Sequence, residues 1–404
     1  MDLDWSPDDL AFVEEVRAFL AAALTPELRE AGRLMTSVYG DHEASMEWQR
    51  RLHARGWAAP AWPKAYGGAE WSVVQRYIYA RERAIAGAPP VSPMGISMCA
   101  PALLGYGTEA QKQFFLPRML SGEHFWCQGY SETEAGSDLA SLQMWAEDDG
   151  DHFVCTGRKL WSTHAHLANW VFCLVRTRRE DRPQRGITFL LIPMDAPGVS
   201  VRPIVSTSGE HIQNEILFES VRVPKDQAVG AIGDGWTVAK YLLEFERGGS
   251  AYAPELGIKL DRIHAAAVDA GADSPAFRAR LAEARQRIDA LEVYEFRAMS
   301  GARPIRNVGG AAAAPSIMKI LGTELSQHLT ELALEVAGDY GQPYQPQRTR
   351  PGGEIHLRTG NADPIGPDMA AIAPLRYLNE RAGSIYAGSN EIQRNIIAKA
   401  AFGL

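Results

Sequence analysis

Apolar residues in the first part of the chain recur every three or four positions, which is the period of an α-helix. The clearest run follows Ser6-Pro7, a helix cap followed by a proline suited to the first helical position. Its apolar members are Leu10, Val13, Val16, Phe19 and Leu20. A second helical run covers about residues 73–85, after a break rich in proline and glycine at 60–68. We therefore predict a helical domain over residues 1–125.

The pattern changes to short apolar strands from residue 126 onward. Asp148-Asp149-Gly150-Asp151 is typical of a tight hairpin turn and is followed by a strand at 152–156. The other predicted strands cover residues 170–175, 187–193, 216–218 and 221–224. Short strands separated by turns indicate an antiparallel β-domain, which we place at residues 126–234.

Helical periodicity returns at residue 235 and predicts long helices near 236–269, 274–300 and 313–337. Residues 341–370 are rich in proline, glycine and polar side chains, and this stretch exceeds a routine loop, so we expect it to be functional or mobile. We assign a C-terminal helical domain to residues 235–404. The predicted fold class is α+β, with a helical domain, a β-domain and a helical bundle in that order.

The composition of the chain argues against a nucleic-acid-binding protein and against a membrane-spanning protein. The chain has 404 residues, with 46% hydrophobic and 22% charged residues, which is ordinary for a globular protein. Its net charge of −8 argues against nucleic-acid binding. We expect no membrane span and no signal peptide, and hence a cytoplasmic protein. The cysteines lack metal-binding spacing and are expected to be buried free thiols: Cys99, Cys127, Cys155 and Cys173.

Two polar segments belong to the predicted β-domain. Residues 127–138 read CQGYSETEAGSD, and residues 157–163 read GRKLWST. Amides and hydroxyl groups on an exposed turn can donate hydrogen bonds to the edge of a planar ring. Taken alone, the first segment also fits a polar loop before an Asp-capped helix. The second also fits a strand whose tryptophan belongs to the core.

A third segment, residues 384–397, reads SIYAGSNEIQRNII. It predicts a corner at 388–390 followed by a helix, and the amides of a helix N-terminus suit phosphate or ribose oxygens. Taken alone, this segment also fits an ordinary terminal helix with a Ser-Asn cap.

Together these segments resemble elements of the flavin-dependent acyl-CoA dehydrogenases, in particular bacterial members that act on steroid side chains and form heterotetramers. The resemblance covers essentially the whole chain and also includes residues 56–68 and 105–112. It implies FAD as cofactor and an acyl-CoA as substrate. One departure is Thr133, where the family usually has proline.

The resemblance assigns roles to individual residues. Those implied to contact FAD are Gln128, Tyr130, Ser131, Ser137, Trp161, Thr163, Ser389 and Glu391. Those implied to line the substrate site are Ser137, Arg247, Gly249, Tyr386 and Ala387. The backbone N–H of Ala387 would polarise the thioester carbonyl, a role that needs no side chain.

The catalytic base is expected at Glu246. The segment at residues 384–397 corresponds to the closing motif of the family. Many family members place the catalytic glutamate directly after the tyrosine of this motif, where this chain has Ala387. A minority branch instead carries it on a mid-chain helix, as a Glu before an Arg, and this chain has Glu246-Arg247. At helical spacing Glu246 shares a face with Ala239, Leu242, Gly249, Ser250 and Ala253.

That face is small and apolar, and Glu246 has no basic residue three or four positions away. Apolar surroundings raise the pKa of a carboxylate, as a general base requires. Glu244, in contrast, lies within reach of Lys240 and Arg247 and is expected to form a solvated ion pair. The helix alone fits an exposed surface glutamate better; the alanine at 387 together with the other family motifs reverses that preference.

One family element is missing. The family usually has an Arg-x-x-Phe-Gly element about 25 residues after Glu-Arg, whose arginine contacts the FAD of a neighbouring subunit. Residues 270–280 contain none, and the usual double glycine is replaced by AGDYG at 337–341. We therefore expect an α2β2 tetramer in which a paralogous partner supplies these contacts. A homotetramer without the element is the simpler alternative.

The implied reaction is α,β-dehydrogenation of an acyl-CoA, with electrons leaving to an electron-transfer flavoprotein. Gly248-Gly249-Ser250 beside the expected base suggests room for a bulky or branched acyl group, although glycines there also permit close helix packing. Two rival functions remain at this point. One is a flavin oxidase or monooxygenase of the same fold, and the other is a non-catalytic subunit that completes its partner's FAD site.

Overall fold

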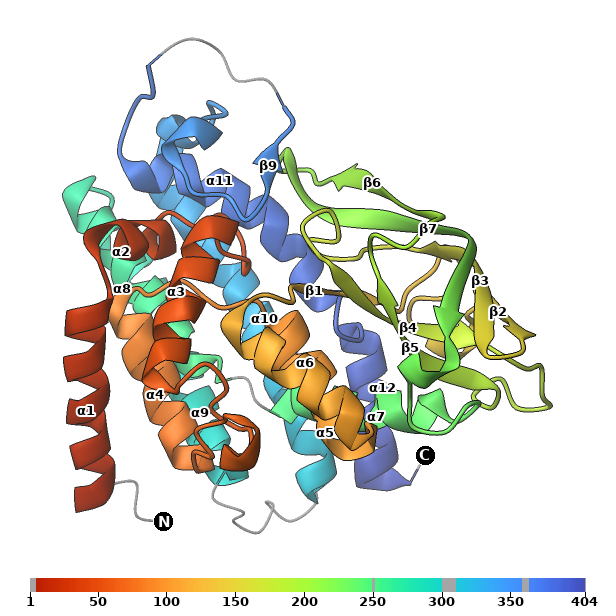
Figure 1. The fold of residues 1–404 in the computed structure, drawn as a ribbon. Helices are drawn as coiled ribbons and strands as arrows, with labels where there is room; N and C mark the ends of the chain where they lie inside the picture. The colour runs from red at the N-terminus through yellow and green to blue at the C-terminus, as the bar shows by residue number, and fades with distance from the viewer. Residues whose placement is uncertain (1–4, 249–250, 300–309, 358–362, 404) are drawn as a thin grey trace. The chain divides into compact units, whose positions relative to one another are not determined.

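The computed structural model describes residues 5–248, 251–299, 310–357 and 363–403, and the side chains of 244–248, 299 and 310–312 lie outside that description. The chain forms two compact units (Figure 1). The helical unit comprises Met1–Trp48, Trp71–Pro90 and Arg247–Leu404. The sheet unit comprises Gln49–Glu70 and Val91–Glu246. The division into three domains at 125/126 and 234/235 stays a prediction.

The helical unit is built from amphipathic helices. Its elements are α1 (Pro7–Ala23), α2 (Pro26–Arg33), α4 (Val73–Ala86), α8 (Ala253–Asp269), α9 (Pro275–Met299), α10 (Gly310–Ala337), α11 (Asp368–Glu380) and α12 (Asn390–Phe402). Short 3-10 turns are η5 (Gly338–Gly341), η6 (Pro346–Arg348) and η7 (Arg381–Ser384). Helices α3 (His42–Arg55) and α7 (Gly235–Gly248) belong in part to each unit.

The core of the helical unit lies between α8, α9 and α10. Buried residues at three- and four-residue spacing, such as Leu256, Leu260 and Ile263, pack with Ile288 and Leu329. The predicted start of α1 is confirmed, because the Ser6 hydroxyl accepts a hydrogen bond from the Asp9 amide and the Asp9 carboxylate accepts one from the Ser6 amide. The predicted helix at 73–85 is also confirmed as α4.

The expectation of one helical stretch over 236–269 is wrong, because α7 ends at Gly248 and α8 begins at Ala253. Two features of the described residues explain the new start. Pro254 lacks an amide hydrogen and is suited to the first turn of a helix. The Glu295 carboxylate of α9 accepts hydrogen bonds from the amides of Tyr252 (2.7 Å) and Ala253 (3.2 Å), which caps α8 from outside.

The sheet unit contains one sheet with strand order β6-β7-β3-β2-β4-β5-β8, and β1 pairs with β4 (Figure 1). The strands are β1 (Trp126–Gly129), β2 (Trp145–Asp149), β3 (His152–Lys159), β4 (Trp170–Arg176), β5 (Ile187–Pro193), β6 (Val199–Val205), β7 (Glu210–Pro224) and β8 (Ala228–Val229). The other elements are η1 (Lys64–Tyr66), the π-helical η2 (Met94–Cys99), α5 (Ala100–Tyr106), α6 (Glu109–Ser121), η3 (Leu139–Ser141) and η4 (Lys225–Gln227).

Most strand pairs are antiparallel, as predicted, while β1 and β2 each pair with β4 in parallel. The predicted hairpin is confirmed: Asp149 pairs with His152, and Gly150 has a φ of +70°. The two strands expected at 216–218 and 221–224 are one strand, β7. Ser220, with a φ of +55°, and a bulge between Cys155 and Gly157 let β7 continue along β3.

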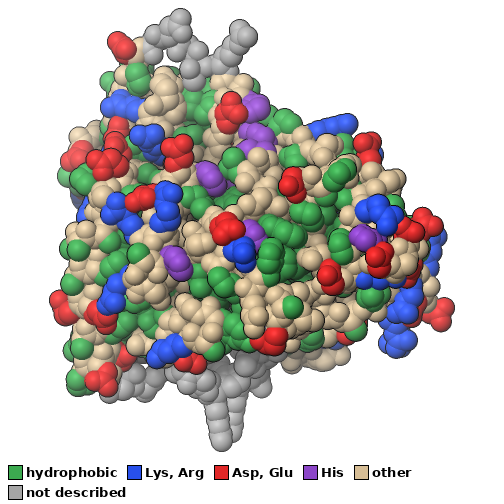
Figure 2. Space-filling model, viewed as in Figure 1, with side chains coloured by type: hydrophobic (Ala, Val, Ile, Leu, Met, Phe, Trp, Pro, Cys, Tyr) green, Lys and Arg blue, Asp and Glu red, His purple; other side chains and the backbone are tan. Residues whose placement is uncertain are grey.

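The remaining general expectations concern the cysteines and the surface. All four cysteines are buried free thiols, as expected. No helix within the described ranges is long and apolar enough to cross a membrane. On the face seen in Figure 2, lysine and arginine side chains are interspersed with acidic ones. In the stretch 341–370, the described residues form short elements, including η6 and β9 (Glu354–Ile355).

Candidate functional site

The predicted flavin-facing segment, residues 127–138, continues after β1 as a loop at 130–138 that is anchored by a buried ion pair. Lys159, fully buried at the end of β3, places its Nζ 2.7 Å from the Glu132 Oε1 and 3.2 Å from the Tyr130 carbonyl oxygen. The Glu132 carboxylate also accepts hydrogen bonds from the amides of Gln143 (2.6 Å) and Met144 (3.0 Å). Glu132 is therefore fixed on both sides, and the loop is tied to the sheet through it.

This anchoring determines which groups of the loop are presented outward. The backbone of Glu132 exchanges two hydrogen bonds with that of Ala135, which closes a turn. Ser137 lies beyond this turn and is exposed, while Ser131 is half-buried and accepts a hydrogen bond from the Leu160 amide at 2.8 Å. The loop thus runs beside the residues that lead into Trp161. Gln128, half-buried on β1, belongs to the strand that enters the loop.

Trp161 stands out because 60% of its surface is exposed although Lys159, two residues earlier at the end of β3, is fully buried. Its φ of +60° and that of His164, +54°, lie in the left-handed region, which non-glycine residues rarely occupy. Between them, the Ser162 amide donates to the Asn214 carbonyl oxygen (3.0 Å), and the His164 amide donates to the Ile212 carbonyl oxygen (2.8 Å). The strained turn is therefore held by β7.

Asn214 completes this clamp. Its side-chain amide donates to the carbonyl oxygens of Ser162 (2.9 Å) and Ile212 (3.2 Å), and its Oδ1 lies 2.6 Å from the His211 Nε2. Thr163 is buried, and its hydroxyl lies 3.2 Å from the Gln213 side-chain oxygen. The sequence analysis did not identify Asn214 as a positioning residue, and no local motif points to it.

Lys159 was also missed, although a signal existed. Phe153, Cys155 and Lys159 all fall on the inward-facing parity of β3, and an inward lysine requires an acidic partner. The predicted residues Gln128, Tyr130, Ser131, Ser137, Trp161 and Thr163 all lie in the sheet unit. The segments that hold them meet through the Leu160–Ser131 hydrogen bond and the Lys159–Glu132 ion pair.

This set of groups fits one edge and one face of a flavin ring. An exposed indole offers a flat apolar surface, and the loop offers amide and hydroxyl donors beside it. The Ser162 hydroxyl is fully buried and has no hydrogen-bond partner among the described residues. An unsatisfied buried hydroxyl is uncommon in a folded protein.

The closing motif lies in the helical unit and has a fixed backbone. Ala387 has a φ of +55°, and its carbonyl oxygen accepts a hydrogen bond from the Gln393 Nε2 at 3.0 Å. Gln393 is fully buried and also accepts a hydrogen bond from the Ser316 hydroxyl at 2.7 Å. The conformation of Ala387 is therefore set by a buried side chain of α12. A preorganised amide at this position suits an oxyanion donor.

The start of α12 agrees with the predicted corner. The Ser389 hydroxyl accepts a hydrogen bond from the Ile392 amide at 3.4 Å and caps the helix. Glu391 is exposed in the first turn, where a backbone amide and the Ser389 hydroxyl lower the pKa of its carboxyl. Tyr386 is 40% exposed. Ser389 and Glu391 are thus available at the surface of this helix N-terminus.

The expected base lies on α7, where the described part supports an apolar setting. Ala239 and Leu242, which share a helical face with position 246, are fully buried. The side chains of Glu246 and Arg247, and the whole of Gly249, lie outside the described residues, so their roles stay predictions.

Models of known protein families match three successive parts of this chain. Family models of the acyl-CoA dehydrogenases match the N-terminal domain at residues 6–123, the middle domain at 127–221 and the C-terminal domain at 233–402. The chain belongs to the acyl-CoA dehydrogenase family. As a member of this flavoprotein family it is an oxidoreductase, and its fold is the family's arrangement of helices, central sheet and helices.

Individual members of the family resemble the chain over its full length. Acyl-CoA dehydrogenase IpdE1 of Mycobacterium tuberculosis is 38% identical over 97% of this chain and 98% of its own length. The crystal structure of the ChsE4–ChsE5 complex from Mycobacterium tuberculosis matches with a TM-score of 0.79 and 30% identity over 100% of this chain and 99% of that one. The Tcur3481–Tcur3483 steroid acyl-CoA dehydrogenase matches with a TM-score of 0.81 and 28% identity, with 100% and 99% coverage.

Glu295 of α9, which caps the start of α8, is expected to make the stability of the protein depend on pH. Burial raises the pKa of Glu295 to about 7, while the two amides that it accepts from oppose the shift. An unfolded glutamate titrates near pH 4.3. Between about pH 4.5 and 7 the folded protein therefore binds more protons than the unfolded one, so its stability falls as pH rises through this window.

Replacing Glu295 with glutamine is expected to remove this pH dependence, because Gln keeps an acceptor for the two amides but carries no charge. When the pH is raised from 4 to 8, the free energy of unfolding of the variant relative to that of wild type should increase by on the order of 3 kcal/mol. Urea unfolding at several pH values measures this change. Glu283→Gln, an exposed position on the same helix, is the control. Parallel pH profiles of wild type and Glu295→Gln would contradict the assignment.

Proposed function

We propose that this chain catalyses FAD-dependent α,β-dehydrogenation of a bulky acyl-CoA thioester, with Glu246 as the base that removes the α-proton. The observation that supports Glu246 most is the burial of Ala239 and Leu242 on the helical face that it shares. A carboxylate on such a face loses hydration, which raises its pKa toward working pH. The alanine at 387 leaves no carboxylate at the alternative position of the family.

In this proposal the other residues bind and position. The preorganised amide of Ala387 polarises the thioester carbonyl, which acidifies the α-proton that Glu246 accepts. Trp161 provides a flat apolar surface, and the loop containing Ser131 and Ser137 provides polar donors for the cofactor. FAD, when bound, supplies the acceptor for the β-hydride. Tyr386, Arg247 and Gly249 are proposed to line the substrate site.

We further propose a steroid side-chain acyl group as substrate. One full-length relative in structure is named a steroid acyl-CoA dehydrogenase, and the chain's Gly248-Gly249-Ser250 offers small residues beside the proposed base. The electron acceptor proposed from the family resemblance is an electron-transfer flavoprotein. A cytoplasmic location accompanies this proposal.

The assembly proposed is an α2β2 tetramer with a paralogous subunit. Two structures that resemble the chain are of two-component proteins, ChsE4–ChsE5 and Tcur3481–Tcur3483. The chain also lacks the Arg-x-x-Phe-Gly element with which family members contact a neighbour's FAD. Both facts support a partner that supplies the missing contacts.

The test begins with the chain purified alone and with a candidate paralogous subunit. Native mass spectrometry is expected to show two copies of each chain with two FAD. Anaerobic addition of a steroid side-chain acyl-CoA should then bleach the visible flavin band. Four copies of this chain with four FAD would contradict the heteromer. A flavin band that does not bleach with acyl-CoAs of varied bulk would contradict the dehydrogenase, and rapid peroxide formation in air would favour the oxidase alternative.

A further inference from the structure

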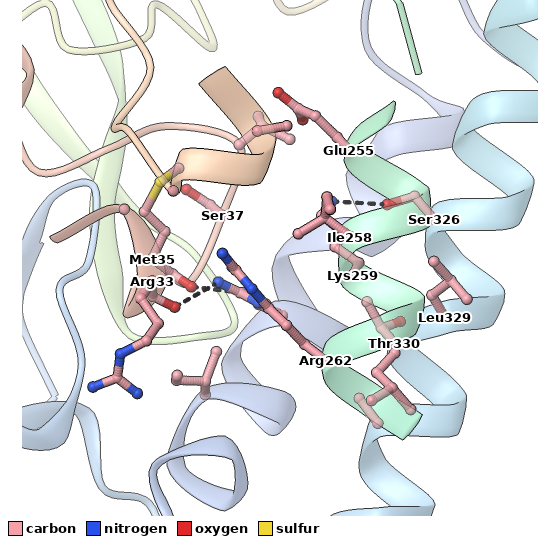
Figure 3. Close-up of a pocket in the computed structure, with 18 of the residues that line it drawn as sticks. Arg33, Met35, Ser37, Glu255, Ile258, Lys259, Arg262, Ser326, Leu329 and Thr330 are labelled. Carbon is pink, nitrogen blue, oxygen red and sulfur yellow. Dashed lines mark hydrogen bonds between the residues drawn. The ribbon is translucent and has the colours of Figure 1, made fainter. Parts of the chain in front are cut away.

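The helical unit contains a cavity of about 340 Å³ whose lining includes none of the cofactor- and substrate-site residues assigned above (Figure 3). Its walls come from α2 and the following segment, the end of α4, and one face each of α8, α10 and α11. The volume lies within the range of small-molecule sites. Much of the lining is apolar, including Met35, Val38, Ile258, Leu329 and Ile372.

The charged residues of the lining are mostly basic. Five are basic and two are acidic: Arg33, Arg83, Lys259, Arg262 and Arg376, with Glu255 and Glu380. Some of these charges are already balanced, because Arg83 pairs with Glu255, and Arg33 pairs with Asp368 at 2.8 Å. Among the described lining residues the other cations are Arg262, Arg376 and Lys259, whose charge also acts on Glu255, and the other carboxylate is Glu380, which acts on Arg376.

Arg262 lines this cavity and has no acidic partner within the described part of the chain. Among the described residues it has neither a hydrogen-bond nor an ion-pair partner, although it carries a full positive charge. In Figure 3 its side chain extends from α8 toward the segment of Arg33 and Met35. The loss of hydration around Arg262 and the nearby charge of Arg33 both lower its pKa. An arginine in this setting is stabilised by an anion.

Arg376 reinforces this local excess of positive charge. Its Nε donates to the Met35 carbonyl oxygen at 2.6 Å and its Nη2 to the Arg33 carbonyl oxygen at 3.2 Å, which fix the guanidinium at the cavity wall. Burial and the charge of Arg262 lower the pKa of Arg376 to about 10, while Glu380 opposes them. Among the described residues, Lys259 donates one hydrogen bond, to the Ser326 hydroxyl at 3.5 Å, and its charge helps to lower the pKa of Glu255.

We propose that this cavity binds a small apolar molecule carrying a carboxylate, with the carboxylate on Arg262. A guanidinium binds a carboxylate through two parallel hydrogen bonds, and the apolar walls accommodate a hydrocarbon body that a free inorganic ion lacks. The carboxylate has two potential sources. It is either a separate amphipathic acid or the far end of this enzyme's own acyl substrate. Only the second source rests on the proposed function.

The binding test uses 4-cyclohexylbutanoate and its neutral amide as probes of equal shape, in calorimetric titrations of the intact protein. We expect the acid to bind at least tenfold more tightly than the amide. Arg262→Gln should lower the affinity for the acid at least tenfold and leave the affinity for the amide unchanged. Arg287→Gln, an exposed arginine of α9 outside the cavity, is the matched control. Ala266→Trp, one helical turn after Arg262 in the lining, should abolish binding of both probes.

Equal affinity for acid and amide, no binding of either, or an equal loss in Arg287→Gln would overturn the proposal. The source of the carboxylate is then separated by kinetics with acyl-CoAs that end in a carboxylate or in its methyl ester. A KM that Arg262→Gln raises for the carboxylate-ended substrate alone assigns the cavity to the substrate. Unchanged KM values together with acid binding assign it to a separate amphipathic acid. The titrations report binding even if no acyl-CoA is turned over.

Discussion

Replacing Glu246 with glutamine is expected to lower the rate of acyl-CoA dehydrogenation by roughly 10²–10⁴-fold, because the variant retains the shape of the side chain but has no group to accept the α-proton. Flavin binding should persist, since the residues proposed to hold FAD lie on other segments. Stopped-flow measurement of flavin bleaching under anaerobic conditions reports this step directly, without a contribution from the electron acceptor.

The matched control is Glu244→Gln, two residues earlier on α7. By helical spacing Glu244 falls on a different face, within reach of Lys240 and Arg247, and its loss should change the bleaching rate by less than about threefold, as expected for a solvated ion pair. Full activity of Glu246→Gln, or an equal loss in both variants, would show that Glu246 is not the base. The non-catalytic subunit would then become the better interpretation.

Replacing Lys159 with methionine is expected to destabilise the sheet unit by about 3–5 kcal/mol, because it leaves the Glu132 carboxylate charged and nearly buried without its cation. Since Glu132 anchors the loop of Ser131 and Ser137, the variant should also lose FAD on purification. Equilibrium urea unfolding and the ratio of flavin to protein absorbance measure the two effects.

Two further variants separate charge from packing. Arg158→Met removes the neighbouring residue, whose ion pair with Glu215 is more than half exposed on the arginine side, and should cost less than about 1 kcal/mol. Lys159→Met combined with Glu132→Gln removes both charges yet keeps an acceptor for the amides of Gln143 and Met144. This double variant should regain part of the stability. If it is less stable than Lys159→Met alone, the unpaired charge is not the cause.

The sequence predicted most of the local structure correctly. The cap at Ser6, the hairpin turn at Gly150 and the helix of α4 all depend on residues a few positions apart, whose hydrogen bonds and dihedral preferences act within one turn. The two wrong predictions concern the bounds of β7 and α8, which depend on residues that are close in space but distant in the sequence. The β7 strand continues through Ser220 because it pairs with β3, and α8 begins anew where Glu295 caps it.

Some features of the candidate site also follow from the sequence alone, and others needed the tertiary structure. The sequence by itself determined the family motifs, since residues 127–138, 157–163 and 384–397 are contiguous and their residue types carry the chemistry. It also determined that position 387 lacks a carboxylate and that position 246 has one. These statements depend on identity and spacing alone, so no structure was needed to make them.

Only the tertiary structure decided what holds those motifs in place. Lys159 reaches Glu132 across 27 positions, Asn214 holds Ser162 across 52, and Arg376 reaches Met35 across 341. A buried charge or amide needs a hydrogen-bond partner. Sequence periodicity does not identify that partner, because the tertiary fold determines which distant residues lie beside it. The basic cavity around Arg262 has the same origin: its lining comes from five segments, and no one of them contains the pattern.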